Sequence, residues 1–191
     1  YLGWRNNRIS AEQYDEFIRK FIAAIKKKLP NVFLHWEDLG RENAARVLSL
    51  HQDALCTFND DVQGTGIVAT AALLSAMRLS HLKLHQQDIV IYGAGSAGIG
   101  IATQLKKMLQ AQGLTPEQAC AKLWLIDRFG LIVNDMAHLT KGQQDFAKPR
   151  EDLAAWHNDE QSSITLDTVV AQIKPAILIG CSGHAGAFKE S

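Results

Sequence analysis

Two pairs of adjacent carboxylates are the residues of this sequence best suited to chemistry. Glu37 and Asp38 follow the apolar segment 32–36, and Asp60 and Asp61 follow a second apolar segment, 55–58. If both segments are strands of one parallel sheet, their ends point the same way and the four carboxylates converge at one edge. Like charges gathered in this way repel one another unless a cation neutralises them. Because oxygen ligands select hard ions, the predicted cation is Mg²⁺ or Mn²⁺; the alternative is that these acids cap helices or stand in solvated turns.

A glycine-rich segment indicates a second kind of chemistry, the binding of a dinucleotide. Residues 93–98 fit the pattern G-x-G-x-x-G, directly after the apolar segment 88–92 and directly before a predicted helix. In such a loop the first glycine permits a tight turn, the second lets the backbone approach a pyrophosphate, and the third allows the helix to pack closely on the strand. The phosphates lie at the helix N-terminus, where free N–H groups favour an anion. The predicted cofactor-binding residues of this loop are Gly93, Ala94, Gly95, Ser96, Ala97 and Gly98.

The next strand along the chain, predicted at 122–126, supplies a carboxylate for the cofactor's ribose. It is followed by Asp127, whose carboxylate is placed to accept hydrogen bonds from the ribose hydroxyls. An acid at this point repels a 2′-phosphate and so favours NAD over NADP, although the adjacent Arg128 could bind that phosphate. Asp127 follows Gly98 by 29 residues (127 − 98 = 29) instead of the usual ~20, and a longer helix with a turn at 114–116 explains the difference. The alternative is a turn aspartate that caps the following loop.

Helix and strand alternate along the chain, as expected of a parallel sheet covered by helices. We predict helices at about 10–29, 42–50, 67–79, 97–110 and 165–173, and strands at 32–36, 55–58, 88–92, 122–126 and 176–180. The helix at 67–79 is apolar nearly all round and is therefore predicted to be deeply buried. The predicted fold class is α/β: a truncated Rossmann-type NAD-binding domain with a parallel sheet, residues 76–191, preceded by a short α/β segment, residues 1–75, that carries the metal-binding acids.

A few further residues lie close to these motifs. Gly180 and Ser182 follow the last predicted strand and are expected to lie beside the nicotinamide half of the cofactor. His35 shares a strand face with Phe33 and could touch the metal, but we expect a packed or solvent-edge histidine. Cys56 is expected to be an inert core thiol.

The longest motifs resemble those of the malic enzyme family. Residues 58–66, F-N-D-D-V-Q-G-T-G, are similar to the family's F-N-D-D-[IV]-Q-G-T motif, and residues 36–38 are similar to the acidic pair upstream of it. The glycine loop with the residues that follow it, 93–102, also matches, as do two further segments, 126–132 and 174–180. The resemblance therefore covers nearly the whole chain.

The resemblance implies an NAD-dependent enzyme that decarboxylates L-malate. It makes Glu37, Asp38 and Asp61 the ligands of Mg²⁺ or Mn²⁺, and it places Asp60 beside that metal site. In the family the metal chelates malate, NAD accepts the hydride from C2, and the metal stabilises the enolate as CO₂ leaves. Two outcomes stay open: pyruvate and NADH, as in malic enzymes, or lactate, as in malolactic enzymes. The resemblance also implies a homo-oligomer, either a dimer or a tetramer.

The resemblance further leads us to expect a central fragment of such an enzyme. The family's general-base lysine, acid tyrosine and malate-binding arginine belong to a segment before Tyr1, and its substrate-binding asparagines to one after Ser191. No catalytic base is therefore assigned, and the chain alone is expected to be inactive on malate. His184 as a catalytic acid is not required by the family's chemistry. Two alternatives remain: a non-catalytic module that senses NAD(H), and another dehydrogenase of related fold that needs no divalent metal.

The bulk composition narrows the function classes. Apolar residues make up 47% of the chain and charged residues 21%, as is ordinary for a soluble globular protein. The 20 basic and 20 acidic residues give zero net charge and no electrostatic surface for nucleic acid or a membrane. The longest apolar-rich stretch, 67–77, is shorter than the ~20 residues that a membrane-spanning helix needs. Three cysteines, an odd number, argue against a disulfide framework and fit a cytoplasmic protein.

Overall fold

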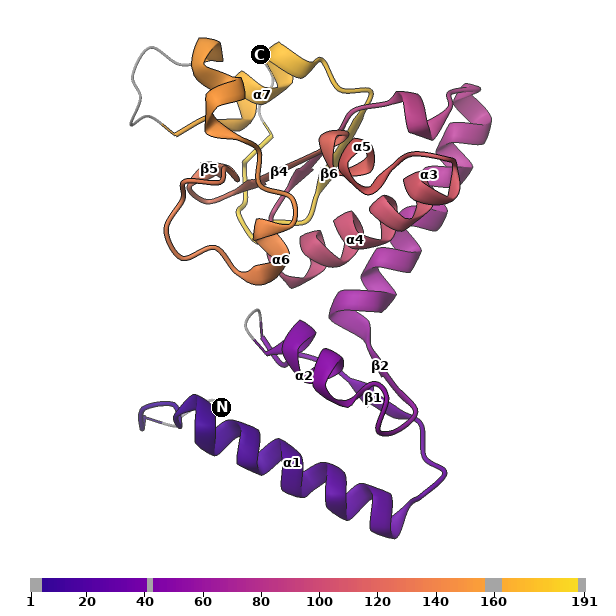
Figure 1. Cartoon of the computed structure of the whole chain (residues 1–191), viewed down its shortest axis with the longest axis vertical. Helices are drawn as coiled ribbons and strands as arrows, with labels where there is room; N and C mark the ends of the chain where they lie inside the picture. Colours follow the sequence, from indigo (N-terminus) through magenta and orange to yellow (C-terminus); the bar gives the residue numbers. More distant parts are fainter. Residues whose placement is uncertain (1–4, 41–42, 157–162, 189–191) are drawn as a thin grey trace.

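The chain folds into two parts that one long helix connects (Figure 1). The structure is a computed structural model and describes residues 5–40, 43–156 and 163–188. One part contains a two-stranded parallel sheet with helices on one side, and the other contains a four-stranded sheet. The predicted α/β class with parallel sheets is confirmed.

In the N-terminal part, helix α1 (Ala11–Lys28) begins at a capping box, close to the predicted helix start. The Ser10 hydroxyl accepts the Gln13 N–H, and the Gln13 side chain accepts the Ser10 N–H, which satisfies two amides at the start of the helix. The apolar face of α1 then buries Ile18 and Ile22. This helix forms one wall of a small core.

Two short parallel strands and one more helix complete this part of the molecule. Strands β1 (Leu34–Trp36) and β2 (Thr57–Asn59) pair so that Trp36 lies opposite Asn59. Helix α2 (Ala44–His51) connects them and adds Val47 to the core that Trp36 shares with α1. The core therefore fixes both strands at their carboxyl ends, where the acidic pairs follow.

Burial in this part is less complete than the apolar segment 32–36 suggests, and the prediction that Cys56 is buried is wrong. The segment 32–36 is buried at Trp36 only, whereas Phe33 is 56% exposed and His35 is exposed. In a two-stranded sheet with helices on one side, alternate side chains face solvent, so half of each strand stays open. Cys56 is exposed and is not a core thiol.

Helix α3 (Thr65–Ser80) runs on from the π-helix η1 (Asp60–Gly64) and leads to the second part. The prediction that it is deeply buried is wrong, because only one face of α3 packs on the protein; Val68 and Leu79 are 70% and 84% exposed. The continuous helical segment is also longer than the stretch expected from sequence. By length and composition alone, residues 60–80 could cross a membrane. This test is weak evidence, since core helices of soluble proteins pass it too.

The second part is built around strand β3 (Ile89–Tyr92) at the centre of a sheet of order β5-β4-β3-β6. Strands β4 (Leu123–Asp127) and β6 (Ile177–Gly180) flank β3 and run parallel to it. Helices α4 (Ser96–Ala111) and α7 (Leu166–Ile173) occupy nearly the predicted positions. The side chains of β3 and α4 that face each other are almost fully buried, so this core fixes the loop between them.

Several short elements were absent from the sequence prediction. Strand β5 (Gly130–Leu131) runs antiparallel to β4, and helix α5 (Pro116–Ala121) follows the predicted turn at 114–116. The stretch 141–156, for which the sequence pattern predicts no element, contains α6 (Lys141–Gln144) and the 3-10 helix η3 (Arg150–Trp156); another 3-10 turn, η2 (Leu84–Gln86), precedes β3. Residues 157–159, and residue 42 of a predicted helix, lie outside the described residues.

Candidate metal and cofactor site

The two acidic pairs lie at the same edge of the small sheet. Glu37 and Asp38 follow β1, and Asp60 and Asp61 follow β2, directly after the paired residues that end each strand. The backbone N–H of Asp38 donates to Asp61 Oδ2 at 2.9 Å, so these two predicted ligands are in direct contact. Asp38 has a φ of 54°, a left-handed conformation that aspartate tolerates better than most residues.

The π-helix η1 presents Asp60 and Asp61 at that edge. Asn59 caps it: its Oδ1 accepts the Val62 N–H at 3.0 Å, and its own N–H donates to Gln63 Oε1 at 3.0 Å. Short π-helical turns are uncommon and often occur at functional sites. Gly64 closes the turn, because a Cβ at this position would overlap Asp60 Oδ1. The sequence therefore uses glycine where the Asp60 carboxylate lies against the helix backbone.

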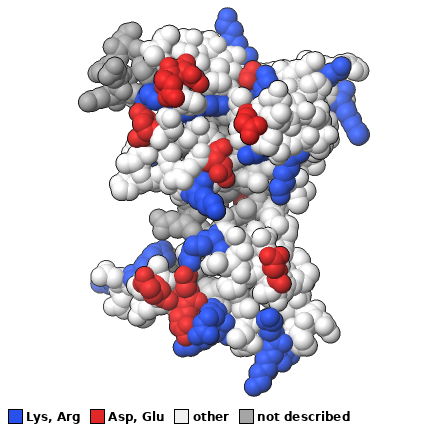
Figure 2. Space-filling model, in the orientation of Figure 1, with Lys and Arg blue, Asp and Glu red and all other residues white. Residues whose placement is uncertain are grey.

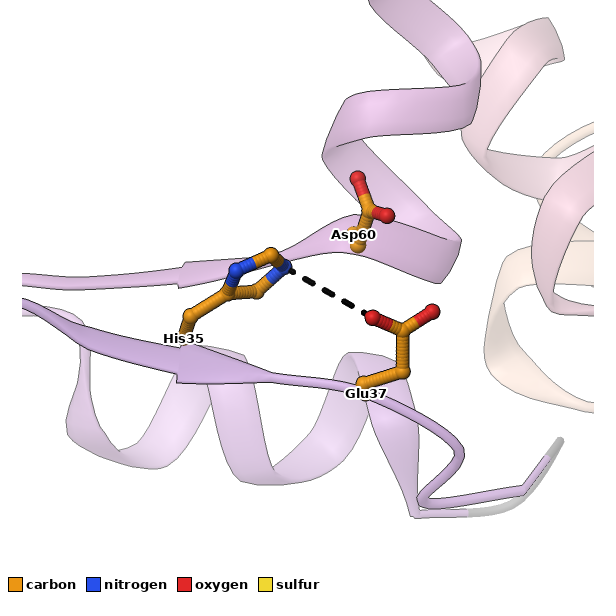
Figure 3. Close-up of side chains that lie close together, drawn as sticks. All are labelled: His35, Glu37 and Asp60. Carbon is orange, nitrogen blue, oxygen red and sulfur yellow. Dashed lines mark ion pairs between the residues drawn. The ribbon is translucent and has the colours of Figure 1, made fainter.

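Side-chain atoms of three residues converge at this edge, and they are not the three that the family resemblance predicts. Within the described part of the chain, potential ligand atoms of His35, Glu37 and Asp60 all lie within 4.8 Å of one another (Figure 3). His35 Nε2 is 4.0 Å from Glu37 Oε2. Glu37 thus faces His35 (Figure 3), while the Asp38 backbone N–H contacts the Asp61 carboxylate. Carboxylates from both strands are available at one edge, as a hard divalent ion requires.

The glycine loop has the tight geometry that its sequence predicts. Gly93 has a φ of 116°, and a Cβ there would lie 2.5 Å from the Ser182 backbone nitrogen. A Cβ at Gly98 would overlap the Gly93 carbonyl oxygen, so only glycine allows α4 to start this close to β3. Gly95 differs, because nothing lies within 4 Å of the position that its Cβ would take. Gly95 is therefore the point of the loop that stays open to a ligand.

The N-terminus of α4 opens into a pocket of about 320 Å³ at the carboxyl ends of β3, β4 and β6. No side chain of the described residues caps this helix, so the first N–H groups of α4 are not satisfied by a capping side chain. A helix N-terminus of this kind favours a phosphate group. The lining contains predicted cofactor residues from three separate segments: Gly93, Gly95, Asp127, Arg128 and Ser182 line it together with Tyr92, Cys181, Gly183 and His184. Gly180 ends β6 next to them and lies under the Phe188 ring.

A buried glutamine that the sequence prediction missed holds Asp127 in this pocket. Gln143 is 2% exposed, and its Nε2 donates to Asp127 Oδ2 and to the Ala94 carbonyl, both at 3.1 Å. Its Oε1 accepts the Thr140 N–H in the capping box of α6. The Arg128 N–H donates to Asp127 Oδ1 at 2.9 Å. The capping pattern T-x-x-Q at 140–143 was the available signal, but it predicts a helix start and not a contact with a distant strand.

Close backbone contacts connect the acidic edge to the cofactor loop. A Cβ at Gly100 of α4 would overlap the carbonyl oxygen of Val62 in η1, and a Cβ at Gly66 of α3 would lie 2.8 Å from the Gly100 carbonyl oxygen. Glycines thus let the helix that begins at the cofactor loop pack directly on the turn that carries Asp60 and Asp61. The two halves of the candidate site are held together by backbone packing.

Burial shifts the pKa of two groups, one beside the cofactor loop and one at the end of α5. It raises the pKa of the Cys181 thiol, which stays protonated and donates to the Gly93 carbonyl at 3.2 Å. It lowers the pKa of Lys148 to about 8, and the Lys148 amine donates to the Cys120 and Ala121 carbonyls at the end of α5. Both groups with shifted pKa values therefore serve the packing of the loop and of α5.

Acidic and basic side chains are interspersed over the face of the molecule that Figure 2 shows.

Comparison with known proteins decides the family. A family model described as "Malic enzyme, NAD binding domain" matches residues 62–191, and one described as "Malic enzyme, N-terminal domain" matches residues 1–52. The chain belongs to the malic enzyme family. The resemblance noted in its sequence motifs is confirmed.

Curated relatives agree with this assignment. The chain is 43% identical over 190 residues to an NAD-dependent malic enzyme of Pseudomonas aeruginosa and 44% identical over 191 residues to NAD-dependent malic enzyme 3 of Bacillus subtilis. In both cases the alignment covers 100% of this chain and 34% of the relative. The chain therefore spans about one third of the length of these relatives.

Solved structures of the same family share the fold. The NAD-dependent malic enzyme of Thermotoga maritima aligns with a TM-score of 0.61 and 26% identity, covering 86% of this chain and 40% of that one. The malic enzyme of Entamoeba histolytica aligns with a TM-score of 0.67 and 21% identity, covering 92% of this chain and 33% of that one. The division of the chain at residue 75 stays a prediction.

Proposed function

We propose that this chain supplies the NAD- and metal-binding part of an enzyme that oxidatively decarboxylates L-malate. The observation that supports the proposal is the close backbone packing of η1, which carries Asp60 and Asp61, on α4, the helix that begins at the cofactor loop. Family membership and relatives named NAD-dependent malic enzymes support NAD and malate. The catalytic base and acid are expected outside these residues.

The proposed metal ligands are Glu37, Asp38 and Asp61, with Asp60 beside them. Their carboxylates fit Mg²⁺ or Mn²⁺ by donor type and by their gathering at one edge. When bound, such an ion polarises the malate hydroxyl and stabilises the enolate that decarboxylation produces. The Asp38 N–H holds Asp61 in place, and the Asn59 cap holds the turn from which Asp61 projects.

The proposed cofactor residues orient NAD through backbone and carboxylate contacts. The residues of the loop 93–98 receive the pyrophosphate at the N-terminus of α4, and Asp127 accepts the ribose hydroxyls. Gln143 and the Arg128 N–H each donate to one oxygen of Asp127, so the carboxylate keeps its orientation. Gly180 and Ser182, at and just after the end of β6, are proposed to lie beside the nicotinamide half of the cofactor. A fixed negative charge at Asp127 favours NAD over NADP.

Binding of Mn²⁺ and NAD to this chain, measured by calorimetry, tests the proposal. We expect Mn²⁺ to bind, Asp61→Ala to weaken Mn²⁺ binding, and NAD to bind more tightly than NADP. If NAD affinity is the same with and without Mn²⁺ and is unchanged by Asp61→Ala, the result would instead support a non-catalytic NAD(H)-sensing module. The proposal predicts that the native gene product needs a divalent metal for activity. Another dehydrogenase of related fold would be active without a divalent metal.

The product distinguishes malic from malolactic activity. The names of the relatives favour release of pyruvate with NADH. Assaying the native gene product with L-malate, NAD and Mn²⁺ while measuring pyruvate, lactate and NADH together decides between the two. Lactate without free NADH would show the malolactic activity. If no malate is consumed, both the malic and the malolactic activity are excluded.

We also propose a homo-oligomer, a dimer or a tetramer, in the cytoplasm. Strongly exposed apolar side chains on α3, including Val68 and Leu79, support an association that covers them. Sedimentation or light scattering of the native gene product measures the state directly, and a monomer at micromolar concentration would contradict this part of the proposal.

A further inference from the structure

We propose that His35, Glu37 and Asp60 form a second cation site, selective for a transition metal such as Zn²⁺ or Co²⁺. It is distinct from the proposed Mg²⁺ or Mn²⁺ site in its ligands, because it uses an imidazole nitrogen and does not use Asp38 or Asp61. Figure 3 shows the His35 imidazole facing the Glu37 carboxylate, with Asp60 next to them at the start of η1.

The strands themselves place the three donors on one face. His35 and Glu37 are two residues apart along β1 and its extension, so their side chains leave the same side of the strand. Asp60 follows Asn59, which pairs with Trp36, and so stands next to Glu37 on the neighbouring strand. This face is the open one, since Trp36 points to the opposite side and into the core.

The distances already suit a shared ion. A metal that binds nitrogen and oxygen at about 2.0–2.2 Å holds its ligands no more than about 4.2 Å apart. His35 Nε2 and Glu37 Oε2 are 4.0 Å apart, and all three potential ligand atoms lie within 4.8 Å of one another. Small side-chain rotations therefore bring the set to bonding distance without movement of the backbone.

Aromatic neighbours orient the imidazole toward the acids. The His35 ring meets the Phe58 ring edge-on at a centroid distance of 5.5 Å, and Phe33 lies 6.5 Å from His35 and 6.3 Å from Phe58. Phe33 and Phe58 thus cover one side of the imidazole, while Nε2 points toward Glu37. A purely solvated histidine has no such restriction on its ring.

The donor set decides the class of ion. One imidazole nitrogen with two carboxylate oxygens suits Zn²⁺ and Co²⁺, and solvent supplies the remaining positions because His35 and Glu37 side chains are 47% and 58% exposed. Mg²⁺ prefers oxygen ligands alone and does not benefit from the imidazole. By donor type, the two ligand sets at this edge of the sheet are therefore expected to prefer different cations.

The two sites share Glu37, and this sharing has a functional consequence that rests on the proposed function. A carboxylate turned toward His35 and Asp60 is withdrawn from Asp38 and Asp61, so Zn²⁺ binding weakens Mn²⁺ binding. We expect micromolar Zn²⁺ to compete with Mn²⁺ on this chain, and Zn²⁺ to inhibit a Mn²⁺-dependent reaction of the native gene product.

Titration of the chain with Zn²⁺, and with Co²⁺ followed by its visible absorption, tests the site directly. Residues that merely support a metal ligand are worth about 10- to 100-fold in affinity, so His35→Ala is expected to weaken Zn²⁺ binding by at least ~100-fold. It should also remove the Co²⁺ absorption of a nitrogen-bound site and leave Mn²⁺ affinity nearly unchanged. His85→Ala, which changes a histidine in the other part of the molecule, is the matched control.

The reciprocal variants separate this inference from the proposed function. Asp60→Asn should weaken Zn²⁺ while Asp61→Asn should weaken Mn²⁺ and spare Zn²⁺. Because His35 is exposed, its replacement is not expected to unfold the chain, and circular dichroism checks this. If Asp61→Asn left Mn²⁺ binding unchanged, this result would overturn the proposed function but not the Zn²⁺ site. Zn²⁺ affinity that is the same in His35→Ala and wild type, or equally reduced in His85→Ala, would overturn the site.

Discussion

The glycine loop and the acidic edge are connected through α4 and η1 but are held in different ways. In the loop, backbone atoms of Gly93, Gly98 and residue 182 approach so closely that added side-chain atoms would overlap them. At the acidic edge, the donors are side chains, and His35 and Glu37 are about half exposed. The loop therefore has a single geometry, whereas the acidic edge can rearrange around the ion it meets.

The largest expected effect is loss of stability from one methyl group in the loop. Gly98→Ala forces a Cβ into the Gly93 carbonyl oxygen, a backbone atom that cannot rotate away. Overpacking of this kind typically costs about 1–3 kcal/mol, and we expect the upper end of that range. Urea unfolding measures it. Gly95→Ala, the same change where nothing lies within 4 Å, is the control and should be close to neutral; equal losses in the two variants would contradict a loop fixed by packing.

The next effect separates cofactor binding from metal binding. Gly95→Val puts a branched side chain at the open point of the loop, where the pyrophosphate is proposed to approach. We expect NAD affinity to fall by at least ~100-fold, that is about 2.7 kcal/mol, with Mn²⁺ affinity nearly unchanged. Calorimetry with each ligand provides both numbers. An equal loss of Mn²⁺ affinity would show that NAD binding at the loop and metal binding at the acidic edge are not separate.

A different lesson comes from how far the sequence predicts each region. The tight geometry of the loop is predictable from the pattern G-x-G-x-x-G, because glycine is needed at the positions where two backbone segments approach too closely for a Cβ. The pairing of β1 with β2 was likewise predicted from two apolar segments that each end in acids. The approach of His35 to Glu37 and Asp60 has no such pattern, because the direction of an exposed side chain depends on its rotamer and not on residue spacing.

The exposed helix face and Gln143 show two further limits. Apolar composition predicted a buried α3, but burial depends on how many neighbours surround a helix, and the described chain provides one face only. Gln143 reaches Asp127 across 16 residues of irregular chain and short helix, a contact that no local pattern specifies. Tertiary placement decides both, and neither helical periodicity nor a capping motif carries that information.

A smaller effect tests whether the loop region depends on this buried side chain. Gln143→Leu keeps the volume but leaves Asp127 Oδ2 and the Ala94 carbonyl without that donor. Removing one partner of a buried hydrogen bond costs about 1–3 kcal/mol. We expect that loss in unfolding free energy and ~10-fold weaker NAD binding, since 1.4 kcal/mol corresponds to tenfold. Gln144→Leu, on the exposed side of the same short helix, should change neither quantity; NAD affinity unaffected by Gln143→Leu would show that Asp127 needs no support.

The smallest effect belongs to the acidic edge, because its side chains can move. Gly64→Ala places a Cβ where Asp60 Oδ1 lies, and the carboxylate can yield by rotating, unlike the carbonyl oxygen opposite Gly98. We expect a change in unfolding free energy below ~1 kcal/mol and a few-fold weaker Zn²⁺ binding, within the range of an indirect ligand contact. Zn²⁺ titration of Gly64→Ala, Asp60→Ala and the double variant measures whether the effect passes through Asp60. If it does, Gly64→Ala adds nothing once the carboxylate is gone. A stability loss as large as that of Gly98→Ala would mean instead that the acidic edge is as rigid as the loop.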